Sequence, residues 1–136
     1  MRVLIADDHS FLREMLADLF ALTEDIAVVA ECADGDEVLP AFQRTRPDVV
    51  LIDEGMPRMP GLEASRALLE AEPDARVLIL TGRFSRASLQ EAQSLGVKGY
   101  LLKGDDPSDL IQRVREVAAG GAAWTPSAAG HPSGHT

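Results

Sequence analysis

The sequence predicts an α/β fold in which helices cover both faces of a five-stranded parallel sheet, a doubly wound (βα)5 sandwich. Short apolar runs rich in β-branched residues alternate with longer segments whose apolar residues recur at helical spacing. The short runs are apolar throughout, which is typical of strands buried on both faces. Because strands and helices alternate along the chain, we expect right-handed βαβ connections and therefore parallel strands.

The first half of the chain supplies two strands and two helices. Strands are predicted at residues 3–6 and 26–30. Asp34 and Gly35 open the second helix, but Pro40 lies inside its apolar pattern and should delay or kink it. The first helix carries an apolar stripe at i, i+3, i+4, i+7 and i+8, formed by Leu12, Met15, Leu16, Leu19 and Phe20.

The second half continues the same alternation. The strands predicted here cover residues 49–52, 77–80 and 99–102. A third helix is predicted at residues 62–71, where Ala64 and Leu68 should face inward.

Two further helices have recognisable ends. The fourth begins after Ser85, a good N-cap residue, and ends before Gly96. The fifth follows a capping Asp106 with proline in its first turn, and it ends before Gly120. Both helices are therefore delimited by residues whose conformational preferences favour helix ends.

The last part of the chain departs from this pattern. Residues 122–136 are mostly Ala, Gly, Ser, Pro and His, and only Trp124 among them could anchor a core. We therefore interpret residues 1–121 as one folded domain and residues 122–136 as a flexible tail or the start of a linker.

Composition excludes several classes of protein. The 136 residues carry a net charge of -9, which argues against binding nucleic acid through phosphate neutralisation. No apolar stretch approaches the roughly 18 residues that a membrane span needs. The single cysteine cannot form an internal disulfide, which fits a reducing compartment such as the cytoplasm.

Polar residues follow the predicted strands at the end of the sheet where α/β proteins bind ligands. Asp7 and Asp8 follow the first strand and Asp53 ends the third; these two strands are neighbours in the strand order 2-1-3-4-5. Three carboxylates in one pocket repel each other, and a divalent cation relieves that repulsion. Because all the candidate side-chain ligands are oxygens, the site suits Mg²⁺.

The same pocket has the parts needed to receive a phosphoryl group. A carboxylate such as Asp53 can act as a nucleophile and form an acyl phosphate. Lys103, after the fifth strand, can supply the compensating positive charge, and Thr81, after the fourth, a hydroxyl donor. The small Gly82 leaves the approach to the pocket open.

These motifs and their spacing resemble one known family. They are Asp7-Asp8-His9, the run that ends at Asp53, Met56-Pro57, Gly61, Thr81-Gly82 and the run that ends at Lys103. The sequence resembles the CheY-like receiver domain of bacterial two-component response regulators over roughly residues 2–120. Within that family it is similar to the NarL type, whose receiver precedes a LuxR-type helix-turn-helix DNA-binding domain that this sequence lacks. The resemblance implies the flavodoxin-like version of the predicted fold.

The resemblance also implies roles for individual residues. Asp53 would accept a phosphoryl group from a sensor histidine kinase, and Asp7, Asp8, Asp53 and the Gly55 carbonyl would hold Mg²⁺. Thr81 would then move toward the phosphate, and Tyr100 would change rotamer to fill the space. His9 is interpreted as a loop residue rather than a ligand, and Cys32 as buried and unreactive.

The resemblance further implies partners and an output. The output face would be the fourth helix, fifth strand and fifth helix, about residues 85–119. Phosphorylation could drive formation of a homodimer, and contact with DNA would pass only through the missing C-terminal domain. The domain would be a phosphoacceptor and not an enzyme, apart from its own phosphorylation and dephosphorylation.

Three other functions compete with this one. A phosphatase or mutase of the haloacid-dehalogenase type needs an acid two residues after the nucleophile, where this chain has Gly55. A flavodoxin-like flavin binder would carry a Ser/Thr/Gly-rich loop in place of Asp7 and Asp8. A receiver-like module that works through protein contacts without phosphorylation stays open, because intact acidic residues permit phosphorylation without proving that it is used.

Overall fold

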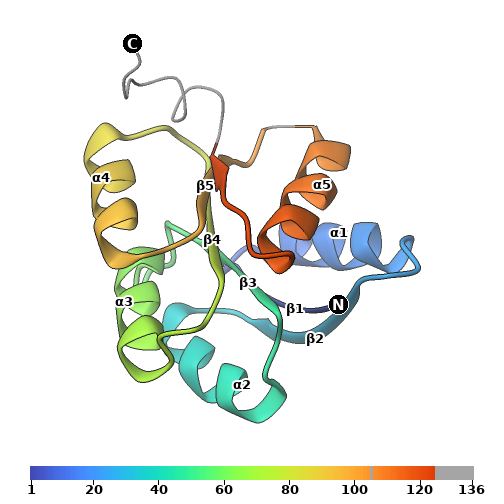
Figure 1. The fold of residues 1–136 in the computed structure, drawn as a ribbon, viewed down its shortest axis with the longest axis horizontal. Coiled ribbons are helices and arrows are strands. Elements are labelled where there is room, and N and C mark those ends of the chain that lie inside the picture. Colours follow the sequence, from blue (N-terminus) through green and yellow to red (C-terminus); the bar gives the residue numbers. More distant parts are fainter. Residues whose placement is uncertain (105, 125–136) are drawn as a thin grey trace.

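The computed structural model describes residues 1–104 and 106–124. Of the tail predicted at residues 122–136, residues 125–136 lie outside the described residues. The chain alternates strands and helices as predicted (Figure 1). The strands are β1 (Arg2–Ala6), β2 (Ala27–Cys32), β3 (Val49–Asp53), β4 (Val77–Thr81), β5 (Gly99–Leu102) and β6 (Ala123–Trp124). The helices are α1 (Ser10–Ala21), α2 (Val38–Thr45), α3 (Gly61–Ala71), α4 (Arg86–Leu95) and α5 (Pro107–Ala118), with a 3-10 turn at Gly35–Glu37 before α2.

The sheet has the order β2-β1-β3-β4-β5-β6, and all its pairings are parallel. The predicted order of the first five strands is therefore confirmed, and β6 is an addition to the predicted sheet. Ala123 pairs with Gly99 and Trp124 with Tyr100. A side chain at Gly99 would meet the Ala123 carbonyl oxygen at 2.0 Å, so this pairing requires glycine.

Helices cover the sheet on both sides and enclose two hydrophobic cores. One core lies under α2, α3 and α4 and contains Phe42, Leu68, Leu89 and Tyr100. The other lies under α1 and α5 and contains Phe20 and Val114 among others. Figure 1 shows α1 and α5 on one side of the strands and α2, α3 and α4 on the other. This double cover explains why the strands are apolar along their whole length.

The helix boundaries follow the local signals. Ser85 caps α4 by accepting a hydrogen bond from the Ser88 amide, and Gly96 ends it in the left-handed region at φ 90°. Asp106 caps α5 through the Ser108 amide. Pro40 falls in the first turn of α2, where it costs no helical hydrogen bond, and the 3-10 turn before it confirms the predicted delay.

One predicted core position is wrong. Leu16 and Phe20 of α1 are buried, but Met15 is 51% exposed. The buried face of α1 is centred between Leu16 and Phe20, and Met15 lies about 120° around the helix from that direction at 100° per residue. Met15 therefore lies outside the buried stripe, although it stands at i+3 from Leu12.

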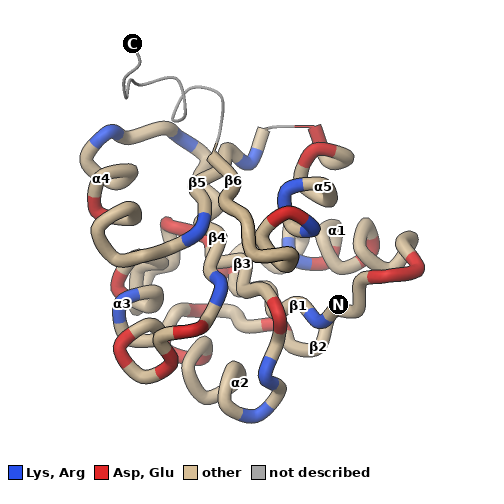
Figure 2. The backbone as a smooth tube through the Cα atoms, viewed as in Figure 1, with Lys and Arg blue, Asp and Glu red and all other residues tan. Residues whose placement is uncertain are grey.

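Charged residues are spread along the chain, and acidic and basic positions are interspersed over helices and loops (Figure 2). Among the described residues, no helix is both long enough and apolar enough to cross a lipid bilayer. Cys32 is buried, as predicted, and burial raises the pKa of its thiol to about 11.

Candidate functional site

Strand register brings the predicted site residues together at the carboxyl end of the sheet. Ala6 pairs with Ile52, so Asp7 and Asp53 come next on adjacent strands. On the other side of β3, Thr81 pairs with Leu102, which places Lys103 immediately beyond the end of β5. The Lys103 amide donates to the Thr81 carbonyl at 2.7 Å and fixes where the lysine side chain begins. The local sequence of each strand thus sets the position of one polar group.

Lys103 joins two buried carboxylates. Its Nζ lies 2.8 Å from Asp53 Oδ1 and 3.1 Å from Asp7 Oδ2. Burial lowers the pKa of this lysine, but its hydrogen bonds and charge interactions with Asp53 and Asp7 raise it by more, so the pKa lies above its usual value. The ammonium therefore stays charged at neutral pH and stabilises two carboxylates that are almost fully buried.

The acidic residues form a cluster that a cation would fit. Asp7, Asp8, His9 and Asp53 each offer a ligand atom, and these atoms lie within 4.8 Å of one another. Asp53 Oδ2 and Asp8 Oδ1 are buried and accept no hydrogen bond from the described residues. Buried anionic oxygens without a donor are costly, and a cation bound among these carboxylates would offset their charge. Because the carboxylates supply hard oxygen ligands, the cluster fits Mg²⁺.

His9 lies at the edge of this cluster. It is the N-cap residue of α1, and its ring Nδ1 is 3.1 Å from Asp7 Oδ1. Its side chain is 65% exposed, which agrees with its interpretation as a loop residue. The contact with Asp7 could not be predicted from sequence, because it depends on the rotamer of an exposed side chain.

An open pocket of about 480 Å³ gives access to Asp53. Its lining includes Gly55, Thr81, Gly82, Arg83 and Lys103. The Thr81 hydroxyl is engaged within its own loop, donating to the Arg83 carbonyl at 2.8 Å and accepting from the Arg83 amide at 3.2 Å. Thr81 is thus at the pocket wall, while its hydroxyl is directed to the loop that follows β4.

The loop after β3 approaches α3 closely. A side chain at Gly61 would meet the Asp53 carbonyl oxygen at 2.3 Å, so only glycine lets the first turn of α3 pack against the backbone of Asp53. The Gly61 amide donates to the Glu54 carbonyl, and the Glu54 amide donates to the Leu80 carbonyl. These bonds hold the backbone around Asp53 between α3 and β4.

Tyr100 is fully buried on β5, and β6 shields the edge beside it. The Ser85 amide donates to its hydroxyl oxygen at 3.3 Å, and the hydroxyl donates to Glu54 Oε1 at 3.2 Å. Burial and the negative charge of Glu54 raise the pKa of Tyr100, so its proton stays on the oxygen. The contact with Glu54 was not predicted from the sequence. The available signal was that Glu54 directly follows Asp53.

Asp34 is a second residue that sequence reasoning placed only as the opening of a helix. Its buried carboxylate accepts hydrogen bonds from the Gly35, Arg58 and Met59 amides at 2.7, 3.1 and 2.8 Å. It thereby ties the loop after β2 to the loop that follows Asp53. No local spacing signals such a contact, because the partners lie 24 and 25 residues away.

Comparison with known proteins agrees with this geometry. The family model for the response regulator receiver domain matches residues 3–115. The chain is 38% identical over 120 residues to the uncharacterized transcriptional regulatory protein YhcZ of Bacillus subtilis, covering 88% of this chain and 56% of that protein. It is 33% identical over 118 residues to the nitrate/nitrite response regulator protein NarL of Escherichia coli, covering 87% and 55%. The chain thus spans about half the length of these relatives.

Solved structures give the same result. A LuxR-family two-component response regulator from Aurantimonas superposes with a TM-score of 0.91 at 34% identity, covering 97% of this chain and 94% of that one. The receiver domain of the putative response regulator NarL from Mycobacterium tuberculosis superposes with a TM-score of 0.83 at 32% identity, covering 88% and 96%. The protein therefore belongs to the response regulator receiver domain family, whose function is phosphorylation-based signalling, and it has relatives of the NarL/LuxR type.

Proposed function

We propose that Asp53 is the phosphoacceptor of this receiver domain and that its donor is a phosphohistidine of a sensor histidine kinase. The observation that carries the proposal is the unequal environment of the two Asp53 oxygens. Oδ1 is paired with Lys103 at 2.8 Å, whereas Oδ2 is buried without a hydrogen-bond donor beside Gly55. The oxygen available for reaction is therefore Oδ2.

In the proposed reaction Asp53 Oδ2 attacks the phosphorus atom, forming a new O–P bond as the N–P bond of the phosphohistidine breaks. The imidazole leaves with the electron pair of that bond. Lys103 keeps its positive charge beside the reacting carboxylate and offsets the charge that the phosphoryl group brings. The absence of a side chain at Gly55 and Gly82 leaves room for the incoming group.

Asp7, Asp8, Asp53 and the Gly55 carbonyl are the groups that would hold Mg²⁺. When bound, the ion would neutralise part of the negative charge of carboxylates and phosphoryl oxygens. The exposed part of Asp8 lies toward solvent, so the cluster is reachable from outside. The buried Asp7 is held in place by the His9 amide, which donates to its Oδ1 at 2.9 Å.

The output would follow from Thr81 and Tyr100. The Thr81 hydroxyl would exchange its bond to the Arg83 carbonyl for one to the phosphoryl group, and Tyr100 would occupy the buried position that it has in this structure. The surface formed by α4, β5 and α5 would carry the change to partners, which include a second copy of the domain.

The segments that match this chain make up 55% of NarL, a nitrate/nitrite response regulator, and 56% of YhcZ, a transcriptional regulatory protein. We propose that this receiver is likewise the regulatory part of a LuxR-type transcription factor, working in the cytoplasm, with DNA bound only by a separate helix-turn-helix domain. Apart from transfer to and from its own Asp53, we propose no enzymatic activity for it.

Phosphorylation by acetyl phosphate tests this proposal. With Mg²⁺ present, intact-protein mass spectrometry should show the gain of one phosphoryl group, and the gain should disappear in Asp53→Asn. Asp74→Asn is the matched control, because Asp74 lines a pocket at the opposite end of the sheet. If the wild type gains nothing at saturating Mg²⁺, the phosphoacceptor proposal fails and a receiver acting through protein contacts alone replaces it.

A further inference from the structure

The hydroxyl of Tyr100 bridges two loops that border the phosphoacceptor pocket. It donates to Glu54 Oε1, in the loop after β3, and accepts from the Ser85 amide, in the loop after β4. Both bonds, at 3.2 Å for the O–H···O bond and 3.3 Å for the N–H···O bond, are slightly longer than the usual ranges, so each is weak and easily biased.

Glu54 is placed so that its main chain is fixed while its side chain is free to reach across the sheet end. Its amide and carbonyl are both used, by Leu80 and Gly61 respectively. The side chain is half-buried and crosses from the end of β3 to the Tyr100 hydroxyl on β5. Its position directly after Asp53 makes it sensitive to charge added there.

Ser85 links the same hydroxyl to α4. Its backbone amide contacts Tyr100, while its side chain caps the helix by accepting from the Ser88 amide. Phe84 stacks edge-on against the Tyr100 ring, with ring centroids 6.2 Å apart and planes at 78°. The buried tyrosine therefore connects the residue after the phosphoacceptor to the first turn of α4.

We propose that Glu54 is a positioning residue that holds Tyr100 in its buried rotamer before Asp53 reacts, and so sets how much of the domain is already in that conformation. A buried hydroxyl needs a partner, and a carboxylate is a stronger acceptor than a neutral group. Without this acceptor the buried rotamer becomes less populated, and anything that binds that conformation binds more weakly by the same factor. The proposal rests on the proposed phosphorylation of Asp53 for its signalling consequence, but not for the contact itself.

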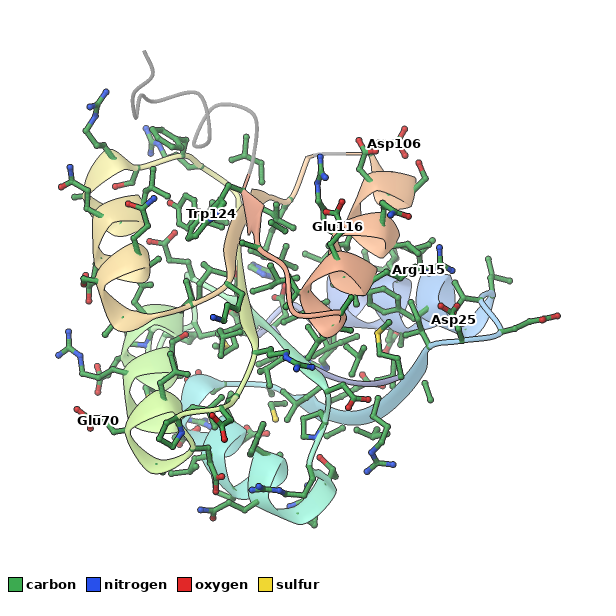
Figure 3. The ribbon with its side chains drawn as sticks, in the orientation of Figure 1. Asp25, Glu70, Asp106, Arg115, Glu116 and Trp124 are labelled. Atoms are coloured by element: carbon green, nitrogen blue, oxygen red, sulfur yellow. The ribbon has the colours of Figure 1, made fainter. Side chains whose placement is uncertain are left out.

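Two substitutions separate the hydrogen bond from the charge. Glu54→Leu removes the acceptor and the charge together, whereas Glu54→Gln keeps an acceptor oxygen and removes only the charge. Tyr100→Phe removes the hydroxyl and serves as the reference for a broken bridge. Trp124, labelled in Figure 3, is the only tryptophan in the sequence. It pairs with Tyr100, so its emission reports on the tyrosine.

The first measurement uses the unphosphorylated protein. Hydrogen exchange of the Ser85 amide by NMR should rise about fivefold in Glu54→Leu, the factor expected for losing one modest hydrogen bond. Tyr100→Phe should change the Ser85 exchange and the Trp124 emission in the same direction. Glu54→Gln, which keeps a weaker acceptor, should raise Ser85 exchange by less than Glu54→Leu. Glu54→Leu/Tyr100→Phe should equal Tyr100→Phe alone. Wild-type Ser85 exchange in Glu54→Leu, or additive effects in the double variant, overturns the proposal.

The second measurement uses beryllofluoride with Mg²⁺, an analogue of the phosphoryl group. Glu54→Leu should bind it severalfold more weakly than Glu54→Gln, since the two variants have the same charge and differ in the acceptor. Equal affinities in the two variants contradict the positioning role. If wild type does not bind the analogue at all, the phosphoacceptor proposal fails, while Ser85 exchange still decides the role of Glu54.

Discussion

Asp34 shows how one buried carboxylate can order a loop that borders a reaction site. Three backbone amides donate to it, two of them from Arg58 and Met59 in the loop that follows Asp53. Burial raises the pKa of Asp34, but these hydrogen bonds and the nearby charge of Arg58 lower it by more, so its pKa lies below the usual value. The ionised form therefore stabilises the fold.

Asp34→Asn should lower the free energy of unfolding at pH 7 by about 1.5–3 kcal/mol, the range for hydrogen bonds to a charged group. The folded pKa of Asp34 is depressed, so its contribution is present above the unfolded pKa of about 3.9 and is lost as pH falls through the folded value. Urea titrations at pH 7 and at pH 3 should therefore show a smaller difference between variant and wild type at pH 3.

The exposed Asp74 provides the control, and Asp74→Asn should leave the unfolding midpoint nearly unchanged at both pH values. An Asp34→Asn effect of the same size at pH 7 and pH 3 would contradict the assignment of the stabilisation to the ionised carboxylate.

At the scale of single elements, α4 is linked to the site through Tyr100. Its N-cap, Ser85, also supplies the amide that contacts Tyr100, and its C-terminus ends at Gly96 with positive φ. Leu89 and Ala92 form its buried contacts. A helix held by few buried residues depends more on its caps, so the cap of α4 should be measurable in stability.

Ser85→Ala should lower the free energy of unfolding by about 1 kcal/mol, because it removes the side-chain acceptor of the Ser88 amide. The backbone amide of residue 85 stays available to Tyr100, so Trp124 emission should change little. Ser94→Ala is the matched control on the same helix: its hydroxyl bonds the Glu91 carbonyl on the exposed surface. Equal losses of stability in the two variants, measured by urea unfolding, would argue against the cap.

The elements themselves were largely predictable because their signals are local. Ser85, Asp106 and Gly96 mark helix ends through backbone and capping preferences, and the structure confirms all three. β6 was missed for the opposite reason. Two residues have no periodicity, and Ala123–Trp124 becomes a strand only because β5 offers an unpaired edge with glycine at position 99.

At the scale of the whole molecule, topology made the site predictable. Once the strand order was predicted, Asp7, Asp53 and Lys103 had to meet, because the carboxyl ends of parallel strands share one edge. Strand order does not predict the contact between Glu54 and Tyr100. That contact depends on a side chain that crosses the end of β4 from β3 to β5, and rotamers are settled by packing rather than by sequence spacing.

The boundary predicted at residue 121 also has a consequence for the whole domain. A chain that ends at Gly121 lacks β6 and leaves the edge of β5 unpaired, an arrangement that favours pairing between molecules. We expect that chain to be less stable by about 1–2 kcal/mol through lost burial of Ala123 and Trp124. Analytical ultracentrifugation should show concentration-dependent self-association that is weaker in a chain ending at Trp124.

A direct test of the same edge keeps the full chain. Gly99→Ala should displace β6 and shift Trp124 emission to longer wavelength, because a Cβ there overlaps the Ala123 carbonyl. Gly104→Ala is the control, since a Cβ at Gly104 would meet nothing within 4 Å. Unchanged Trp124 emission in Gly99→Ala would show that the sheet edge can accommodate a side chain.

The parallel direction of β6 also determines where a tether would be attached. Trp124, labelled in Figure 3, pairs with Tyr100 of β5. Tyr100 is three residues before Lys103, on a strand that rises about 3.3 Å per residue. A segment joined after Trp124 would thus start about 10 Å from the end of the sheet that holds Asp53. The length of the linker after Trp124 would set the effective concentration of that segment around the acidic pocket. Changing the linker length would therefore tune how strongly the pocket and the joined segment influence each other.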